Sequence, residues 1–230
     1  LPLVFAVVFS TVILHGFSIG WLARRLELAG KSSNGVLIVG AHQWSTDLAL
    51  TLEKAGLPVL LMSDSWNNLK QARLLGIPIH YGEVLSEKVH QSLDLSDMGH
   101  LLANTSNHAY NSLVCSVYIH QFGRDKVFQI ATTERKEERR QLSGSFRGKV
   151  LFGGNLVYKE LIVLFLEGWR FKKTRLTEEF DMEKLISSNE GKIKPFIRLQ
   201  SNGELDLDFF ENQSGTKPGD TIISFSYSKS

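Results

Sequence analysis

The stretch GVLIVGAHQWSTDLALTLEKAGLPVLLMSDS, residues 35–65, decides the fold class. It opens on the continuous apolar run VLIV, which is typical of a parallel strand covered on both faces. Leu48, Leu52 and Ala55 then fall on one face of a helix, and Gly56 follows them as a cap. A second β-like run, PVLLM, follows, so these residues predict a strand–helix–strand unit.

The same alternation continues along the chain. Helices are predicted over 67–75, 86–93 and 108–122, and strands over 77–81, 100–103 and 126–131. Strands that alternate with helical patterns predict a doubly wound parallel sheet with right-handed crossovers. The expected fold class is therefore α/β, with a Rossmann-type domain over residues 34–133.

The pattern of the amino-acid sequence changes after this domain. The mixed-charge run ERKEERR, residues 134–140, leads into a Ser- and Gly-containing stretch and indicates a domain boundary. Short β-like runs separated by turns then predict a small β-rich module over residues 146–230, with one helix over 159–167.

The first 22 residues contain no Asp, Glu, Lys or Arg, which is the pattern of a transmembrane helix. A helix of this length rises ~33 Å, close to the thickness of a hydrocarbon core of about 30 Å. Arg24, Arg25 and Lys31 follow, and the positive-inside rule places the chain after about residue 28 in the cytoplasm. Residues 1–28 are thus expected to end a membrane domain in the cell inner membrane. A buried core helix of a soluble domain is the alternative.

Composition and motifs narrow the function classes. The 26 basic and 24 acidic residues nearly cancel, which disfavours a nucleic-acid partner. Cys115, the single cysteine, lies among aliphatic residues and is interpreted as core packing in a reducing compartment. The histidines form no metal-binding motif, and no nucleophile elbow is present. We expect neither a metal site nor an enzyme.

A dinucleotide site of the Rossmann type uses three glycines after its first strand, for the tight turn, the approach to the diphosphate and helix packing. Here the corresponding run is GAHQWS, and only Gly40 is a glycine. The side chain of His42 is expected to crowd a diphosphate, and Ser45 stands at the packing position. The nucleotide site is therefore predicted to be degenerate.

The same kind of site uses an acid at the end of its second strand to bind ribose hydroxyls. Ser63 occupies the expected place and Asp64 the next one. Glu83 follows Gly82 after the third strand, where ligand-facing groups gather, although it could equally cap the next helix.

The runs VLIVG, LPVLLMSDS, ARLLGIPIHYGE and LLANTSN resemble the regulator-of-potassium-conductance (TrkA-N-like) domain, a ligand-binding Rossmann module of prokaryotic potassium channels, uptake systems and antiporters. The segment STVILHGFSIGWLARRLEL is similar to the closing membrane helix of bacterial monovalent cation:proton antiporters (the sodium/hydrogen exchanger family). KPGDTIISF resembles the end of the small module that follows such domains.

The resemblance implies a cytosolic regulatory portion of a Na+(K+)/H+ antiporter, paired as a homodimer and joined to a membrane transport domain. It implies NAD(H) or an adenine nucleotide as candidate cofactor. The implied ligand contacts are Gly40, His42, Ser45, Ser63, Asp64, Glu83, Asn104 and Thr105. Three alternatives remain: a gating subunit of a potassium channel or uptake system, a soluble NAD-dependent oxidoreductase, and a Rossmann shell that binds no nucleotide.

Overall fold

The computed structural model describes residues 2–25, 33–132, 148–209 and 215–227. The chain divides into two compact units, Leu1–Ser33 and Asn34–Ser230. Each unit is described by itself.

The first unit is built on α1 (Pro2–Arg25), a helix through the predicted apolar segment. Among the residues that the structure describes, no helix combines the length and hydropathy needed to cross a membrane, so the predicted transmembrane helix is not confirmed. Thr11 Oγ1 donates to the Val8 carbonyl at 2.8 Å, and His15 Nδ1 lies 2.9 Å from the Thr11 carbonyl.

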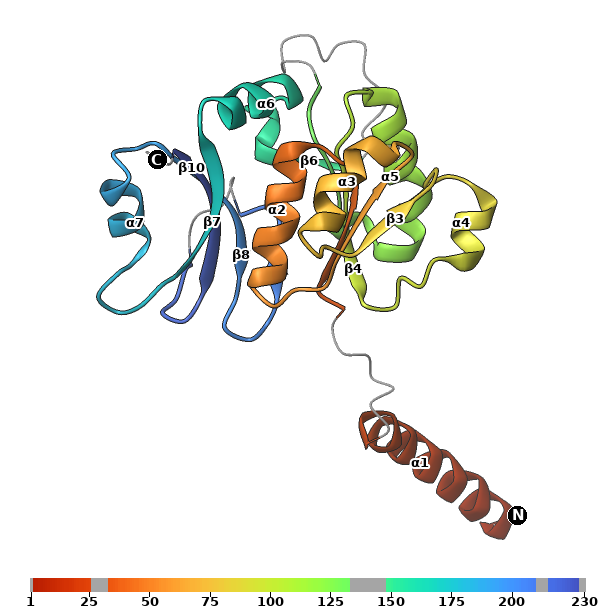
Figure 1. Cartoon of the computed structure of the whole chain (residues 1–230). Coiled ribbons are helices and arrows are strands. Elements are labelled where there is room, and N and C mark those ends of the chain that lie inside the picture. The colour runs from red at the N-terminus through yellow and green to blue at the C-terminus, as the bar shows by residue number, and fades with distance from the viewer. Residues whose placement is uncertain (1, 26–32, 133–147, 210–214, 228–230) are drawn as a thin grey trace. The chain divides into compact units, whose positions relative to one another are not determined.

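The second unit contains the predicted parallel sheet (Figure 1). Its strands are β1 (Gly35–Val39), β2 (Val59–Ser63), β3 (Ile79–Tyr81), β4 (Met98–Ala103), β5 (Val127–Gln129) and β6 (Lys149–Val150). They lie in the order β3-β2-β1-β4-β5-β6, and every neighbouring pair is parallel. The strand order reverses at β1, which confirms the doubly wound α/β fold.

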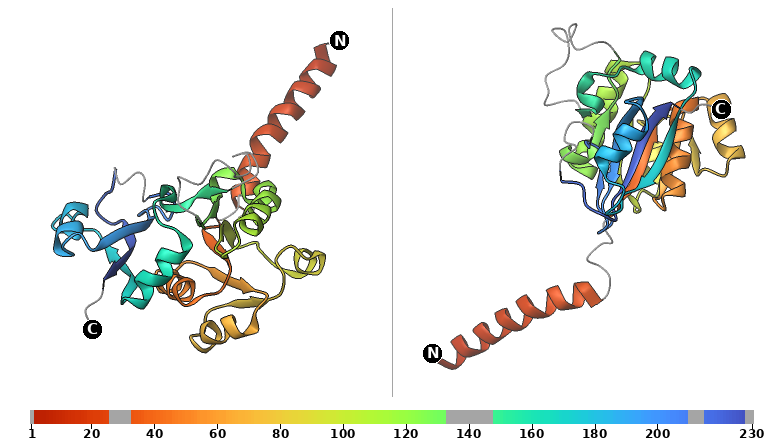
Figure 2. Two further views of the ribbon diagram at one scale, coloured as in Figure 1. Left: turned by 90° about the horizontal axis from the view of Figure 1, so that it is seen from above. Right: turned by 90° about the vertical axis from the view of Figure 1, so that its left-hand side faces the viewer.

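Helices cover both faces of this sheet: α2 (Gln43–Lys54), α3 (Trp66–Leu74), α4 (Glu87–Ser92) and α5 (His108–Phe122). Alternate residues of β1 point to opposite faces, as the pleat requires. Val36 and Ile38 pack with α2 and α3, while Leu37 and Val39 pack with α4 and α5. The two helix layers are visible from above in Figure 2. The continuous apolar run of β1 is thus explained by burial on both sides.

The β-rich part forms a second, antiparallel sheet. Its strands are β7 (Trp169–Arg175), β8 (Ile193–Leu199), β9 (Leu205–Asp206) and β10 (Thr221–Tyr227), in the order β7-β10-β8-β9. Two α-helices, α6 (Tyr158–Leu166) and α7 (Met182–Ser188), accompany it, with the 3-10 turns η1 (Arg124–Lys126) and η4 (Leu151–Gly154) before them.

The boundary predicted between residues 133 and 146 does not separate two independent bodies. β6 belongs to the predicted module, yet it pairs with β5 through Phe128 and Lys149. Helix α2 packs against β7, where Asp47 Oδ2 accepts a 2.8 Å hydrogen bond from the Phe171 amide. One hydrophobic cluster therefore runs through both sheets. The charged run 134–140 lies outside the described residues.

Candidate functional site

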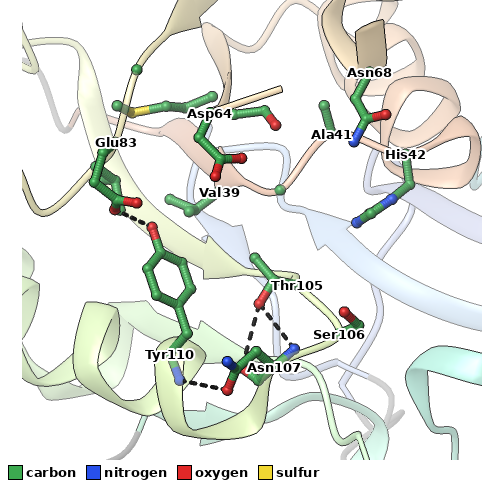
Figure 3. Close-up of a pocket in the computed structure, with 15 residues that line it drawn as sticks. Val39, Ala41, His42, Asp64, Asn68, Glu83, Thr105, Ser106, Asn107 and Tyr110 are labelled. Carbon is green, nitrogen blue, oxygen red and sulfur yellow. Dashed lines mark hydrogen bonds between the residues drawn. The ribbon is translucent and has the colours of Figure 1, made fainter. Parts of the chain in front are cut away.

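The carboxyl ends of the first four strands meet around a cavity of about 330 Å³ (Figure 3). It lies where the strand order reverses, which is the usual ligand position in an open parallel sheet. Its volume is at the lower end of the range for small-molecule sites. Its lining comes from four strand ends and the helices after them: Val39, Gly40, Ala41, His42, Met62, Ser63, Asp64, Asn68, Gly82, Glu83, Val84, Thr105, Ser106, Asn107 and Tyr110.

Gly40 makes the turn from β1 into α2 and could not be another residue without strain. Its φ is +107°, a region that side chains disfavour, and an added Cβ would lie 2.6 Å from the Asn104 carbonyl oxygen. The Gly40 carbonyl accepts hydrogen bonds from Asn104 Nδ2 at 2.9 Å and from Ser45 Oγ at 3.0 Å. The floor of the cavity is thereby fixed.

Ser45 and Asn104 were both expected to contact a ligand, but the structure places them behind the turn. Both side chains are fully buried, and neither lines the cavity. Besides its bond to Gly40, Ser45 Oγ accepts from the His42 amide at 2.8 Å. These two residues therefore hold Gly40 and His42 in position.

His42 lies at the N-cap of α2, with its side chain on the cavity side (Figure 3). Its ring nitrogens lie 3.0 and 3.2 Å from the hydroxyl of Tyr158 on α6. The two rings also meet edge to face, with centroids 5.2 Å apart and planes at 75°. Burial lowers the pKa of His42 below its ordinary value, so the ring is neutral at pH 7.

Ser63 and Asp64 both line the cavity, but only Asp64 directs the polar group of its side chain into it. The Ser63 hydroxyl turns back and accepts a 3.1 Å bond from the Ser65 amide. The Asp64 carboxylate points into the cavity in Figure 3. The acid thus reaches the site from one position later than the expected place.

Glu83 bonds to a residue that the sequence did not indicate. Its Oε1 accepts a hydrogen bond from the Tyr110 hydroxyl and another, at 3.2 Å, from the Leu85 amide just before α4. Burial, followed by the hydrogen bond and charge of Glu83, raises the pKa of Tyr110 well above its ordinary value. Tyr110 therefore keeps its proton and donates a hydrogen bond to the Glu83 carboxylate across the whole neutral range. Its place in the first turn of the predicted helix 108–122 is the sequence feature that could have indicated a role for Tyr110 in the site.

The loop after β4 completes the cavity. Thr105, one of the predicted ligand contacts, lines it, and its hydroxyl donates to Asn111 Oδ1 at 2.6 Å. Asn107 caps α5 by accepting from the Tyr110 amide at 3.1 Å. These local bonds hold Tyr110 toward Glu83.

Hydrogen-bond acceptors define what the cavity can do. The described residues that line it include two carboxylates, from Asp64 and Glu83, but no lysine or arginine. Across the part of the chain that the structure describes, no cluster of His, Cys, Asp and Glu has the make-up of a metal site. Carboxylates placed at strand ends beside a glycine turn suit the hydroxyls of a ribose.

Residues 36–145 match the family model of the TrkA-N domain. The TrkA-N domain of inner membrane protein ybaL from Escherichia coli is 15% identical, with a TM-score of 0.44, over 58% of this chain and 93% of that one. Residues 36–145 are therefore a TrkA-N domain, and this part of the resemblance is confirmed.

Further similar structures belong to a channel. The GsuK RCK domain is 14% identical, with a TM-score of 0.42, over 86% of this chain and 45% of that one. The GsuK channel bound to NAD is also 14% identical, with a TM-score of 0.43, over 88% and 38%. The chain thus spans less than half the length of the GsuK chains. Comparison with curated proteins finds no match.

Proposed function

We propose that this chain, which carries a TrkA-N domain at residues 36–145, is the nucleotide-responsive regulatory part of a Na+(K+)/H+ antiporter. It works as a homodimer at the cytoplasmic side of the inner membrane, with a membrane transport domain as its partner. Its task is binding rather than catalysis, and the candidate ligands are NAD(H) and adenine nucleotides.

One observation carries the proposal. The carboxylates of Asp64 and Glu83 face a single cavity beside the Gly40 turn, at the carboxyl ends of parallel strands. A ribose with two free hydroxyls fits such a pair of acceptors. Glu83 is hydrogen-bonded to Tyr110 on α5. A ligand that contacts Glu83 would therefore also affect α5, which covers the face of the sheet opposite to α2. Regulation requires such a link between a ligand and a second element of the fold.

Binding is tested by calorimetry of the chain with adenosine, AMP, ATP, NAD and NADH. Asp64→Asn should weaken binding of every ribose-containing ligand that the wild type binds, by about tenfold, because a charged acceptor is lost. Asp94→Asn is the matched control, since Asp94 is exposed and does not line the cavity. Equal losses in both variants, or no binding of any ligand to the wild type, would contradict the proposal.

The transport role needs a separate measurement. Inverted membrane vesicles from cells that make the whole gene product should release a preformed proton gradient when Na+ or K+ is added. The release should change with the bound ligand in the wild type and lose this response in Asp64→Asn. Rubidium flux without proton exchange would support the potassium-channel alternative instead, and absence of both would reject a transport role.

A further inference from the structure

We infer that the cavity takes an adenine nucleoside or its monophosphate and rejects ligands with a diphosphate or triphosphate, and that His42 sets this limit. The inference rests on the proposed function, because it concerns the same site. In this inference His42 selects among nucleotides, whereas the sequence alone suggested that it weakens nucleotide binding in general.

The position of His42 is the first argument. In a dinucleotide-binding turn this place is a glycine, which lets the diphosphate approach the backbone and the amino end of the next helix. Here the turn glycine Gly40 is kept, but an imidazole stands two residues later at the N-cap of α2. The ring therefore occupies the space through which a diphosphate would reach the amides of α2.

The ring is also held in place. The Tyr158 hydroxyl bonds to its nitrogens, and the Tyr158 ring packs against it edge to face. Tyr158 is 8% exposed and belongs to the hydrophobic cluster shared by both sheets. Swinging the imidazole aside would break this contact with a side chain that cannot follow it.

His42 and Asn68 lie between two spaces. Both line the main cavity and also a second cavity of about 240 Å³ toward α6, which Trp44 and Phe165 line as well. The main cavity, at about 330 Å³, is within the size range of small-molecule sites without the second space. Removal of the imidazole would open a path between the two cavities and give a dinucleotide room.

Charge supports the same conclusion. The described lining of the main cavity offers two carboxylates and no lysine or arginine, and the imidazole of His42 is neutral at pH 7. Each added phosphate would therefore bring negative charge toward Asp64 and Glu83 without a cationic partner. Affinity should fall from adenosine or AMP to ATP.

The test is calorimetry of the chain with adenosine, AMP, NAD and ATP, for wild type, His42→Gly and Tyr158→Phe. Glycine is a favourable N-cap residue and can adopt the extended backbone of His42, so His42→Gly should fold. Wild type should prefer AMP over NAD by at least about tenfold. His42→Gly should raise NAD affinity by about tenfold or more and leave adenosine affinity within about threefold. Tyr158→Phe should give a smaller gain for NAD, because it frees the ring without removing it.

His120→Ala, on the exposed surface of α5, is the control and should match the wild type. NAD or ATP binding to the wild type as tightly as AMP would overturn the inference and leave the proposed function standing. Unchanged NAD affinity in His42→Gly would overturn the role of His42. Failure of wild type and His42→Gly to bind any of the four ligands would reject the proposed function, and the inference with it.

Discussion

Replacing Gly40 by alanine should destabilise the protein far more than the same change at Gly56. Both glycines have positive φ, +107° and +87°; Gly40 follows directly on β1, and Gly56 follows the C-cap residue of α2. They differ in their surroundings. A Cβ at Gly40 would lie 2.6 Å from the Asn104 carbonyl oxygen, whereas a Cβ at Gly56 meets nothing within 4 Å.

The two costs can be separated. Forcing a side chain into a disfavoured backbone region costs about 1–3 kcal/mol, and this term applies to both variants. Overpacking costs a further ~1–3 kcal/mol and applies only at Gly40, because the nearest atoms there belong to the backbone of Asn104, just after β4, rather than to a movable side chain. Gly40→Ala should therefore be less stable than Gly56→Ala by about 1–3 kcal/mol. That difference corresponds to a melting temperature lower by roughly 2–12 °C.

Urea unfolding followed by tryptophan fluorescence and circular dichroism measures the difference. The two variants should show similar m-values and separate midpoints, which assigns the change to the folded state. Coincident midpoints would refute the close approach of β1 and β4 at this turn. Ligand binding gives a second readout, because the carbonyl of Gly40 forms part of the turn beneath the cavity.

Three further outcomes are expected. Asp47→Ala should cost about 1–3 kcal/mol in urea unfolding, because the Phe171 amide loses its acceptor, whereas Asp47→Asn keeps an acceptor oxygen and should cost less. Burial lowers the pKa of His100 from 6.5 to about 4, so the unfolded chain binds more protons between these values. Stability should therefore fall by about 3 kcal/mol as pH drops through this window, and this slope should be reduced in His100→Gln. Because burial and Glu83 raise the pKa of Tyr110, the folded state holds this proton above pH ~10, where the unfolded chain loses it. Stability should then fall as pH rises past that value, less so in Tyr110→Phe, and tyrosinate absorbance of this variant should show one late-titrating phenol fewer than that of the wild type.

Local sequence patterns were sufficient for the elements of the parallel sheet. The helix predicted over 108–122 matches α5 at both ends, because Asn107 supplies an N-cap and Gly123 a stop. The run VLIV predicted a strand buried on both faces, and the two helix layers confirm it. These features depend on neighbours along the chain, which a sequence shows directly.

The candidate site was only partly predictable. Gly40, Asp64 and Glu83 follow strands whose ends must converge in a parallel sheet, so counting along the chain found them. Tyr110 and Tyr158 come from helices, and their partners lie 27 and 116 residues away. Such contacts depend on helix rotation and tertiary packing, for which no local pattern exists.

The packing between the two predicted domains could not be read from the sequence, for a related reason. A charged run marks a solvated segment, but it does not reveal what packs on either side of it. The pairing of β6 with β5 and the contact of Trp44 with Phe171, at 6.4 Å between centroids, join elements from both sides of that run. Only the folded arrangement shows that the two sheets share a core.

That common interior constrains how proteins of this build can diverge. Trp44 and Leu48 of α2 share a hydrophobic cluster with Phe171 and Phe196 of the second sheet. A recombination event that exchanged the antiparallel sheet alone would leave an apolar helix face against side chains of the wrong shape. Viable chimaeras would have to carry α2 along with the sheet, although α2 lies on the other side of the charged run in the gene. Packing therefore requires the two sheets to be inherited together, even though the charged run between them resembles a domain boundary.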